Sequence, residues 1–274
     1  MGRIYGNRSR EKQVKDFLKI LLREAGQICL REQGKIGQQD LEFKNRKDIV
    51  TVTDKKVEDF IIRQIQEQYP DHDILGEETG VSRAKISRSS PPFLWVIDPI
   101  DGTTSFFHGQ PFFSVSIAVK KGDHTLLGGV YAPVLDLLFL AEKGKGAFLN
   151  DLPIRVSSCE ILADSVMATG FACLRAGLKK NNLIHFTRIV PLLRDIRRFG
   201  SAALDLCYVA CGKLDGFWEM ELNLYDIAAG ALIAEEAGAV VTDFSGGKEF
   251  PGKGIVAANP SLSRLLIDQL RSKH

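Results

Sequence analysis

The feature that most constrains the fold is a short apolar run that ends in an acid. Residues 93–98 read Phe-Leu-Trp-Val-Ile-Asp, a pattern that predicts a buried strand. Pro99 follows directly, and because proline has no N–H and a fixed φ, we expect the chain to turn there. Proteins that layer helices on sheets build their sites where strands end. The run therefore indicates an α/β protein with a functional site after Asp98.

Helical and strand-like segments alternate along the rest of the chain. Apolar residues at helical spacing predict a long helix over residues 10–33 and a second over 55–70. Residues 81–92 are polar and end in prolines, which predicts a surface loop. Further strands are predicted within 43–54, at 72–78, within 112–151, and at 165–171, 214–221, 240–247 and 254–259, and further helices at 183–198, 200–213, 225–239 and 260–272.

This order of elements predicts mixed α and β structure in layers, without internal repeats. We expect one domain over residues 1–274. A soft internal division is expected near residues 151–160. It would separate an N-terminal α+β half from a C-terminal α/β half.

The composition argues against several classes of protein. Hydrophobic residues make up 45% and charged residues 26% of the 274 residues, which is ordinary for a globular protein. The net charge of +2 argues against a dedicated nucleic-acid or membrane-surface protein. No apolar run approaches the ~20 residues of a membrane span, and the first residues carry no signal peptide. Five cysteines without a Cys-X-X-Cys pair suit a reducing compartment. We therefore expect a cytoplasmic protein without a membrane or nucleic-acid partner.

The segment after the buried strand carries hard oxygen ligands. Asp98, the carbonyl of Ile100 and Asp101 follow one another closely, and such oxygens suit Mg²⁺ or a similar ion. Gly102 permits a close approach of the backbone to a ligand, and N–H groups from Thr103 onward suit a phosphate. The alternative interpretation is a turn with two solvated acids.

Three more junctions between elements carry an acid. Asp54 follows a β-branched segment, Glu77 follows an apolar one, and Asp226 begins a predicted helix. An Asp at a helix start is usually only an N-cap, but four such junctions together favour a shared metal site. Carboxylates gathered without cations repel, so at least one should have a raised pKa. The helix start should favour the ionised form of Asp226.

Several segments carry a resemblance to a known family. Their sequences and their order along nearly the whole chain resemble those of the inositol monophosphatase family of metal-dependent sugar phosphatases. The three signature segments are 76–78, 95–106 and 225–239, and supporting segments are 48–54, 198–206 and 217–221. The resemblance implies a layered α-β-α-β-α sandwich of the inositol monophosphatase and fructose-1,6-bisphosphatase type. It also implies a homodimer.

The resemblance implies a role for each matching residue. It implies two Mg²⁺ ions, with a third, weaker ion allowed by the family and Mn²⁺ as a substitute. The implied metal ligands are Glu77, Asp98, the Ile100 carbonyl, Asp101 and Asp226. The implied catalytic residues are Glu77 and the pair Asp54 and Thr103, which orients the attacking water. The implied substrate contacts are Asp101, Gly102, Thr103, Gly200, Ser201, Ala202, Glu219 and Asp226. Glu219 alternates with Trp218 along a predicted strand, so the two side chains should point to opposite faces. Without the resemblance, Glu219 is equally a charge on a surface strand.

The reaction that the resemblance implies is Mg²⁺-dependent hydrolysis of inositol 1-phosphate, or of a related polyol or sugar phosphate, by a metal-activated water. Alternatives within the family are a fructose-1,6-bisphosphatase or dual-specificity sugar phosphatase, a histidinol-phosphate phosphatase and a nucleotide 3′-phosphatase. Phosphatases of the haloacid-dehalogenase type are disfavoured, because their paired acids are two residues apart and lie near the N-terminus. Ser105, Asn223 and Tyr225 depart from the usual family residues, which leaves the choice of substrate open.

A different class of function is a regulatory member that binds RNA or protein. Its candidate surface is a set of basic residues, namely Lys179, Lys180, Arg194, Arg197 and Arg198. The simpler interpretation of these residues is the solvated face of a helix. The full set of acids favours retained catalysis over this alternative.

Overall fold

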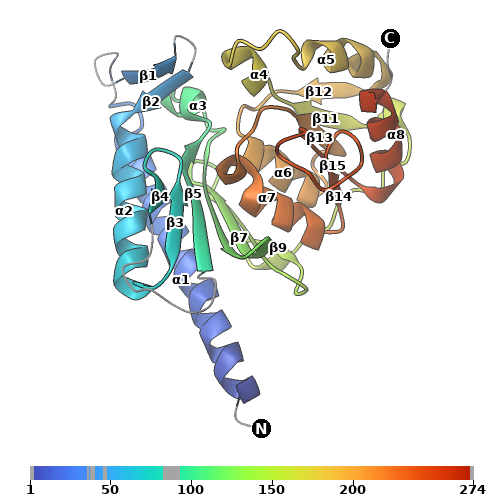
Figure 1. The fold of residues 1–274 in the computed structure, drawn as a ribbon. Helices are drawn as coiled ribbons and strands as arrows, with labels where there is room; N and C mark the ends of the chain where they lie inside the picture. The colour runs from blue at the N-terminus through green and yellow to red at the C-terminus, as the bar shows by residue number, and fades with distance from the viewer. Residues whose placement is uncertain (1–2, 36, 38–40, 46–47, 83–92, 272–274) are drawn as a thin grey trace.

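The computed structural model describes residues 3–35, 37, 41–45, 48–82 and 93–271 (Figure 1). The loop expected at 81–92 lies outside the described residues except for its first two, which belong to a short strand, β4 (Gly80–Ser82). Among the described residues, no helix combines the length and the apolar character that a membrane span needs.

An eight-stranded sheet forms the first half of the molecule. Its strand order is β10-β9-β8-β7-β6-β5-β3-β4, and all neighbours are antiparallel except β3 and β5. A two-stranded hairpin of β1 and β2 precedes it. The bounds are β1 Leu41–Asn45, β2 Asp48–Thr51, β3 Asp73–Gly76, β5 Phe93–Asp101, β6 Ser114–Lys121, β7 His124–Ala132, β8 Leu137–Glu142, β9 Ala147–Leu149 and β10 Leu152–Pro153.

A five-stranded sheet forms the second half, in the order β12-β11-β13-β15-β14. β11 runs parallel to β12 and β13, whereas β15 runs antiparallel to β13 and β14. The bounds are β11 Val166–Thr169, β12 Asp195–Arg197, β13 Gly216–Glu219, β14 Val240–Thr242 and β15 Ile255–Ala258.

Helices separate and cover the two sheets, which confirms the layered α-β-α-β-α sandwich (Figure 1). α1 (Arg3–Glu32) and α2 (Val52–Gln68) pack on the outer face of the large sheet. α6 (Ala202–Ala210) and α7 (Leu224–Glu236) lie between the sheets, and α8 (Pro260–Arg271) covers the small one. One buried apolar cluster lies between α1, α2 and the large sheet, a second surrounds α6 and α7 between the two sheets, and a third lies between the small sheet and α8. The remaining helices are α3 Thr103–Phe107, α4 Ala172–Arg175 and α5 Leu183–Ile189, with short 3₁₀ turns at Leu162–Asp164 and Val190–Leu192.

The helix predicted over residues 183–198 is wrong in its second half. α5 ends at Ile189, a 3₁₀ turn containing Pro191 follows, and Asp195–Arg197 form β12 beside β11. Pro191 has no N–H with which to continue the hydrogen bonds of a helix. The sequence pattern of Asp195–Arg197 does not decide its structure, and pairing with β11 makes it a strand.

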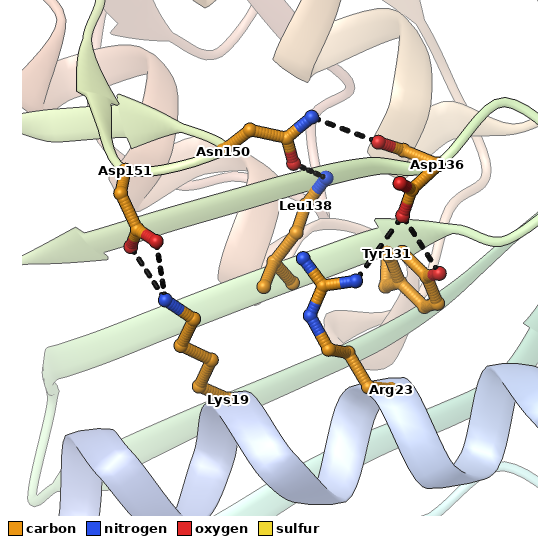
Figure 2. A network of polar contacts seen from close by, with 7 residues as sticks. All are labelled: Lys19, Arg23, Tyr131, Asp136, Leu138, Asn150 and Asp151. Atoms are coloured by element: carbon orange, nitrogen blue, oxygen red, sulfur yellow. Dashed lines mark hydrogen bonds and ion pairs between the residues drawn. The ribbon is translucent and has the colours of Figure 1, made fainter.

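Polar contacts anchor α1 to the turns of the large sheet (Figure 2). Lys19 Nζ binds the carboxylate of Asp151 at 2.5 and 2.6 Å, and Arg23 Nη1 binds Asp136 Oδ1 at 3.1 Å. Asn150 Nδ2 donates to the carbonyl of Asp136 at 2.8 Å. Because these groups are largely exposed, the ion pairs contribute little to stability. The stability of α1 comes mainly from its buried apolar face, and the polar contacts link its exposed side to the turns of the sheet.

Candidate active site

Two of the predicted acids lie at the end of the central strand β5. The strand runs through Pro99 to Asp101 instead of turning at Pro99, and its pairing with β6 shifts register between Asp98 and Asp101. Such a bulge absorbs the missing N–H of the proline and re-aims the side chains around it. Asp98 is 1% exposed, and within the described part of the chain its Oδ1 has no hydrogen-bond partner. Burial, with Glu77 and then Asp101 nearby, raises the pKa of Asp98 well above its usual range.

Asp101 joins the two halves of the molecule. Its carboxylate accepts hydrogen bonds from Ser201 Oγ at 2.5 Å and from the N–H groups of Ala202 and Ala203 at 3.2 and 2.7 Å. Ser201 is the N-cap of α6 and accepts from the N–H of Leu204. Burial raises the pKa of Asp101 to about 6 in spite of these three bonds. The first turn of α6 therefore positions this acid.

Asp54 and Thr103 lie in hydrogen-bond contact, as their predicted shared role requires. Asp54 accepts from the N–H and hydroxyl of Thr51 at 2.8 and 2.5 Å, which completes a capping box at the start of α2. The hydroxyl of Thr103 lies 3.1 Å from Asp54 Oδ1 and 3.1 Å from the carbonyl of Ile100. That carbonyl retains one lone pair for another ligand. Burial raises the pKa of Asp54 to about 7.

Gly102 is required by the protein's own packing. Its φ of 94° lies in the left-handed region that favours glycine. A Cβ at this position would lie 2.9 Å from the carbonyl oxygen of Phe112 and 3.2 Å from that of Gly200. The sequence indicated that the backbone at Gly102 approaches a ligand closely. In the structure, this backbone closely approaches the backbone of Phe112 and of Gly200. This approach brings the start of α3 against the residue before Ser201.

Glu77 lies on a loop that a buried acid holds. Glu58 of α2 is 0% exposed and accepts from the N–H groups of Glu78 and Thr79 at 3.0 and 2.8 Å. A Cβ on Gly76 would come within 2.6 Å of the Glu58 carboxylate, so the loop passes directly over it. The sequence analysis did not identify Glu58. A charged residue on the apolar face of an amphipathic helix was the available signal.

Asp226 occupies the third position of α7 and accepts from the N–H of Asn223 at 2.5 Å. Burial raises the pKa of Asp226 well above its usual range, against the lowering effect of that N–H, and the charges of Asp101 and Glu77 raise it further. The helix start favours the ionised form of Asp226, as expected, but desolvation outweighs this effect and raises its pKa. The prediction of at least one raised pKa among the acids is confirmed.

Asp101 and Asp226 line a small polar pocket together with the predicted substrate contacts Gly200, Ala202 and Glu219, whereas Ser201 is not among its lining residues. Its walls are Asp101, Gly170, Arg175, Arg198, Gly200, Ala202, Asp205, Glu219, Leu222 and Asp226. Glu219 is 5% exposed and accepts from the N–H of Ala172 at 3.0 Å, whereas Trp218 packs into the apolar cluster on the opposite face of β13. The alternative of a surface strand charge is therefore wrong. Burial raises the pKa of Glu219 to about 7, while Arg175 and Arg198 oppose the shift.

Arg198, Arg175 and Asp205 line this pocket, and the sequence analysis missed all three. It placed Arg198 in a basic surface patch, but of that patch Arg194 and Arg197 pair with Asp164 and Asp195 instead. Asp205 stands inside the otherwise apolar helix Ala202–Ala210, which was the signal available for it. Arg175 follows a loop that no pattern in the sequence placed.

The donor chemistry of the site fits a hard cation. Glu77, Asp101 and Asp226 lie close enough to Asp98 for their charges to raise its pKa, and Asp98 Oδ1 has no hydrogen-bond partner among the described residues. Among those residues, however, no group of three or more His, Cys, Asp or Glu side chains is arranged so that it could hold a metal ion. Asp101 and Asp226 instead accept hydrogen bonds from helix starts. Binding a cation therefore requires side chains to reorient.

A family model and several relatives match nearly the whole chain. The model of the inositol monophosphatase family matches residues 10–274. The chain belongs to the inositol monophosphatase family. A family relative named inositol-1-monophosphatase, from Mesorhizobium japonicum, is 38% identical over 90% of this chain and 92% of its own length. Another, from Pasteurella multocida, is named Nus factor SuhB and is 40% identical over 91% of this chain and 92% of its own.

Solved structures of family members share the fold. The crystal structure of the extragenic suppressor protein suhB from Bartonella henselae matches with a TM-score of 0.87 and 37% identity, covering 96% of this chain and all of that one. The inositol monophosphatase from Anabaena matches with a TM-score of 0.83 and 34% identity, over 95% of this chain and 96% of that one. Family membership supports a phosphatase, and such family members are in general dependent on Mg²⁺.

Proposed function

We propose that the protein hydrolyses a phosphate monoester of a polyol, with inositol 1-phosphate or a related sugar phosphate as substrate. The observation that carries the proposal is the buried, unpartnered oxygen of Asp98, whose neighbours include the acids Glu77, Asp101 and Asp226. A buried carboxylate oxygen without a donor is costly unless a ligand satisfies it. A cation is the ligand that this cluster of acids favours.

Glu77, Asp98, the carbonyl of Ile100, Asp101 and Asp226 would hold Mg²⁺. When bound, two such ions neutralise phosphoryl charge, lower the pKa of water and stabilise the leaving oxygen. We propose two ions, with a third allowed and with Mn²⁺ as a substitute. The number and identity of the ions are a proposal from the donor set and the family.

Thr103 and Asp54 would orient the attacking water. The Thr103 hydroxyl directs its hydrogen toward Asp54 Oδ1, so its oxygen is left to accept a hydrogen bond from water. Asp54, with a pKa raised to about 7, can take up a proton near neutral pH. The N–H groups of Gly102 and Thr103 are the proposed donors to the phosphate. The hydroxyl groups of the polyol would contact Gly200, Ser201, Ala202 and Glu219. Asp101 and Asp226 would contact the substrate between its phosphate and its hydroxyl groups.

Phosphate release from inositol 1-phosphate, with and without Mg²⁺, tests this function. We expect release that saturates with Mg²⁺ and stops when a chelator is added. A panel that includes fructose 1,6-bisphosphate separates the main alternative, a fructose-1,6-bisphosphatase or dual-specificity enzyme. Absence of Mg²⁺-dependent release from every sugar, inositol and nucleotide phosphate would reject the proposal.

A regulatory role in binding RNA or protein is the second candidate, because several relatives carry the name Nus factor SuhB. The ion pairs of Arg194 and Arg197 with neighbouring acids reduce the charge of the proposed basic surface, so they disfavour it as an RNA site. Salt-sensitive RNA binding without phosphatase activity would favour this candidate.

We also propose a cytoplasmic homodimer that folds as a single domain. Family resemblance supports the dimer, and five free cysteines suit a reducing compartment. Light scattering of the purified protein measures the oligomeric state. A monomer at micromolar concentration would contradict the dimer.

A further inference from the structure

Asp205 is the acid of the pocket that neither the proposed metal site nor the proposed hydroxyl contacts use. It lies on α6, one turn after Ser201, and its side chain lines the pocket between the two sheets. It is 1% exposed, and burial raises its pKa well above the usual range, followed by the charges of Glu219 and Asp101. The packing of α6 alone does not account for a buried acid at this position.

The carboxylate of Asp205 differs from its neighbours in its partners. Asp54, Asp101, Asp226 and Glu219 each accept at least one hydrogen bond. Within the described part of the chain, Asp205 accepts none, and its Oδ1 is fully buried. Removing an acceptor from water without a donor costs free energy, so such groups persist mainly where a ligand completes them.

Arg198 is the complementary group across the same pocket. Its guanidinium lies against the backbone of Gly200, where a Cβ would come within 2.3 Å of Arg198 Nη1. Its charge lowers the pKa of both Asp205 and Glu219, so it is near both. Among the residues that the structure describes, it makes no ion pair or hydrogen bond with either. The guanidinium of Arg198, a donor, and the carboxyl group of Asp205, an acceptor, thus line one pocket without a hydrogen bond between them.

We propose that Asp205 is a specificity-determining residue that accepts a hydrogen bond from a hydroxyl of the substrate, whose oxygen in turn accepts from Arg198. A hydroxyl suits this pair because it donates one hydrogen bond and accepts others. The contact is additional to the one proposed for Glu219. It selects phosphate esters of polyols or sugars with a further hydroxyl over esters without one. This inference rests on the proposed phosphatase function and names a feature of its substrate.

The test compares Asp205→Asn with the wild type at fixed Mg²⁺. The substrates are inositol 1-phosphate, an aryl phosphate and a set of deoxy analogues that each lack one ring hydroxyl. Because Asn is a weaker acceptor and brings an amide N–H without a partner into the pocket, we expect kcat/KM for inositol 1-phosphate to fall about tenfold or more, mainly through KM. The loss should exceed that on the aryl phosphate. On one deoxy analogue the wild type and the variant should agree within about twofold, because the contact is absent from both.

A merely structural role gives a different pattern. The same penalty on every substrate would overturn the inference. So would a fall of several degrees in the melting temperature of Asp205→Asn, since a carboxylate without protein partners loses no hydrogen bond on substitution. The matched control is Asp215→Asn. Asp215 accepts from Ser157 Oγ and the N–H of Val166 at 2.6 and 2.7 Å, so its substitution should lower the melting temperature.

The two proposals fail differently. If the wild type hydrolyses none of these esters, the proposed function is wrong and the inference is wrong with it. If the wild type hydrolyses them and Asp205→Asn shows no dependence on any hydroxyl, only the inference is wrong.

Discussion

Residues of one chemical type have different roles here because their partners differ. Asp101 and Asp226 are buried acids held by backbone N–H groups, whereas Asp98 has an oxygen that no described residue satisfies. The sequence identified all three, since each follows a strand or begins a helix. It did not identify Glu58 or Asp205, because the only signal for each was an acid in an apolar stretch of helix, which does not show what the acid contacts. Their importance depends on which segments the fold packs against them.

Glu219 gives a prediction at this scale. Glu219→Gln keeps the shape of the side chain but removes its charge, so it should weaken polyol substrates more than an aryl phosphate. We expect kcat/KM for inositol 1-phosphate to fall about tenfold or more, because the lost contact is a charge-assisted hydrogen bond. Steady-state kinetics on both substrates measure the difference. Equal losses on the two substrates would remove Glu219 from the hydroxyl-binding site.

At the scale of elements, the site depends on how helices and strands begin and end. The capping box of α2 positions Asp54, the first turn of α6 positions Asp101, and the bulge in β5 separates Asp98 from Asp101. The strands and the longer helices followed from periodicity in the sequence. The short helix α3 and strand β12 did not, because a few residues carry too little periodicity and their conformation is decided by tertiary contacts. Pairing beside β11 decides β12, for example.

Glu58 supports a prediction about the loop that carries Glu77. Glu58→Ala removes the acceptor of the N–H groups of Glu78 and Thr79, so the loop that carries Glu77 should loosen. Loss of such a supporting contact typically weakens metal binding by about 10–100-fold. Titration calorimetry with Mg²⁺ measures the affinity directly, apart from turnover.

The control for Glu58 lies on the same helix. Glu67 of α2 is exposed, so Glu67→Ala should leave the affinity for Mg²⁺ as it is in the wild type. Equal affinities for Glu58→Ala and the wild type would show that the loop does not need this carboxylate.

At the scale of the whole molecule, the site draws on both sheets. β5 of the large sheet supplies Asp98 and Asp101, and β13 of the small sheet supplies Glu219, while α6 and α7 lie between them. The pattern of helical and strand-like segments correctly predicted mixed α and β structure in layers, and the family resemblance implied the order of those layers. The sequence did not predict the closure of the pocket by Arg175 and Arg198, which depends on how distant loops meet.

Burial of several acids predicts how stability depends on pH. The folded-state pKa values of Asp54, Asp101 and Glu219 are raised to about 7, 6 and 7. Each group therefore favours the fold while protonated, and this contribution is lost as the pH rises from about 4 through those values. Cations offset the loss by neutralising the ionised carboxylates. We expect the rise in melting temperature on adding Mg²⁺ to be larger at pH 8 than at pH 6, as measured by calorimetry. A rise that does not depend on pH would contradict this account.

The most direct test of the central claim is the rate of phosphate release from inositol 1-phosphate as a function of Mg²⁺, for the wild type and Asp98→Asn. Asn keeps the size of the side chain, and Asp98 Oδ1 has no hydrogen-bond partner among the described residues that the substitution would remove, so we expect the variant to remain folded. The account predicts that the rate of the wild type saturates with Mg²⁺. The variant should be at least ~1,000-fold slower at every concentration, in line with the loss of a main stabilising group in an active site. A folded Asp98→Asn protein with near-normal, Mg²⁺-dependent release would contradict the assignment of this acid to a cation-binding catalytic site.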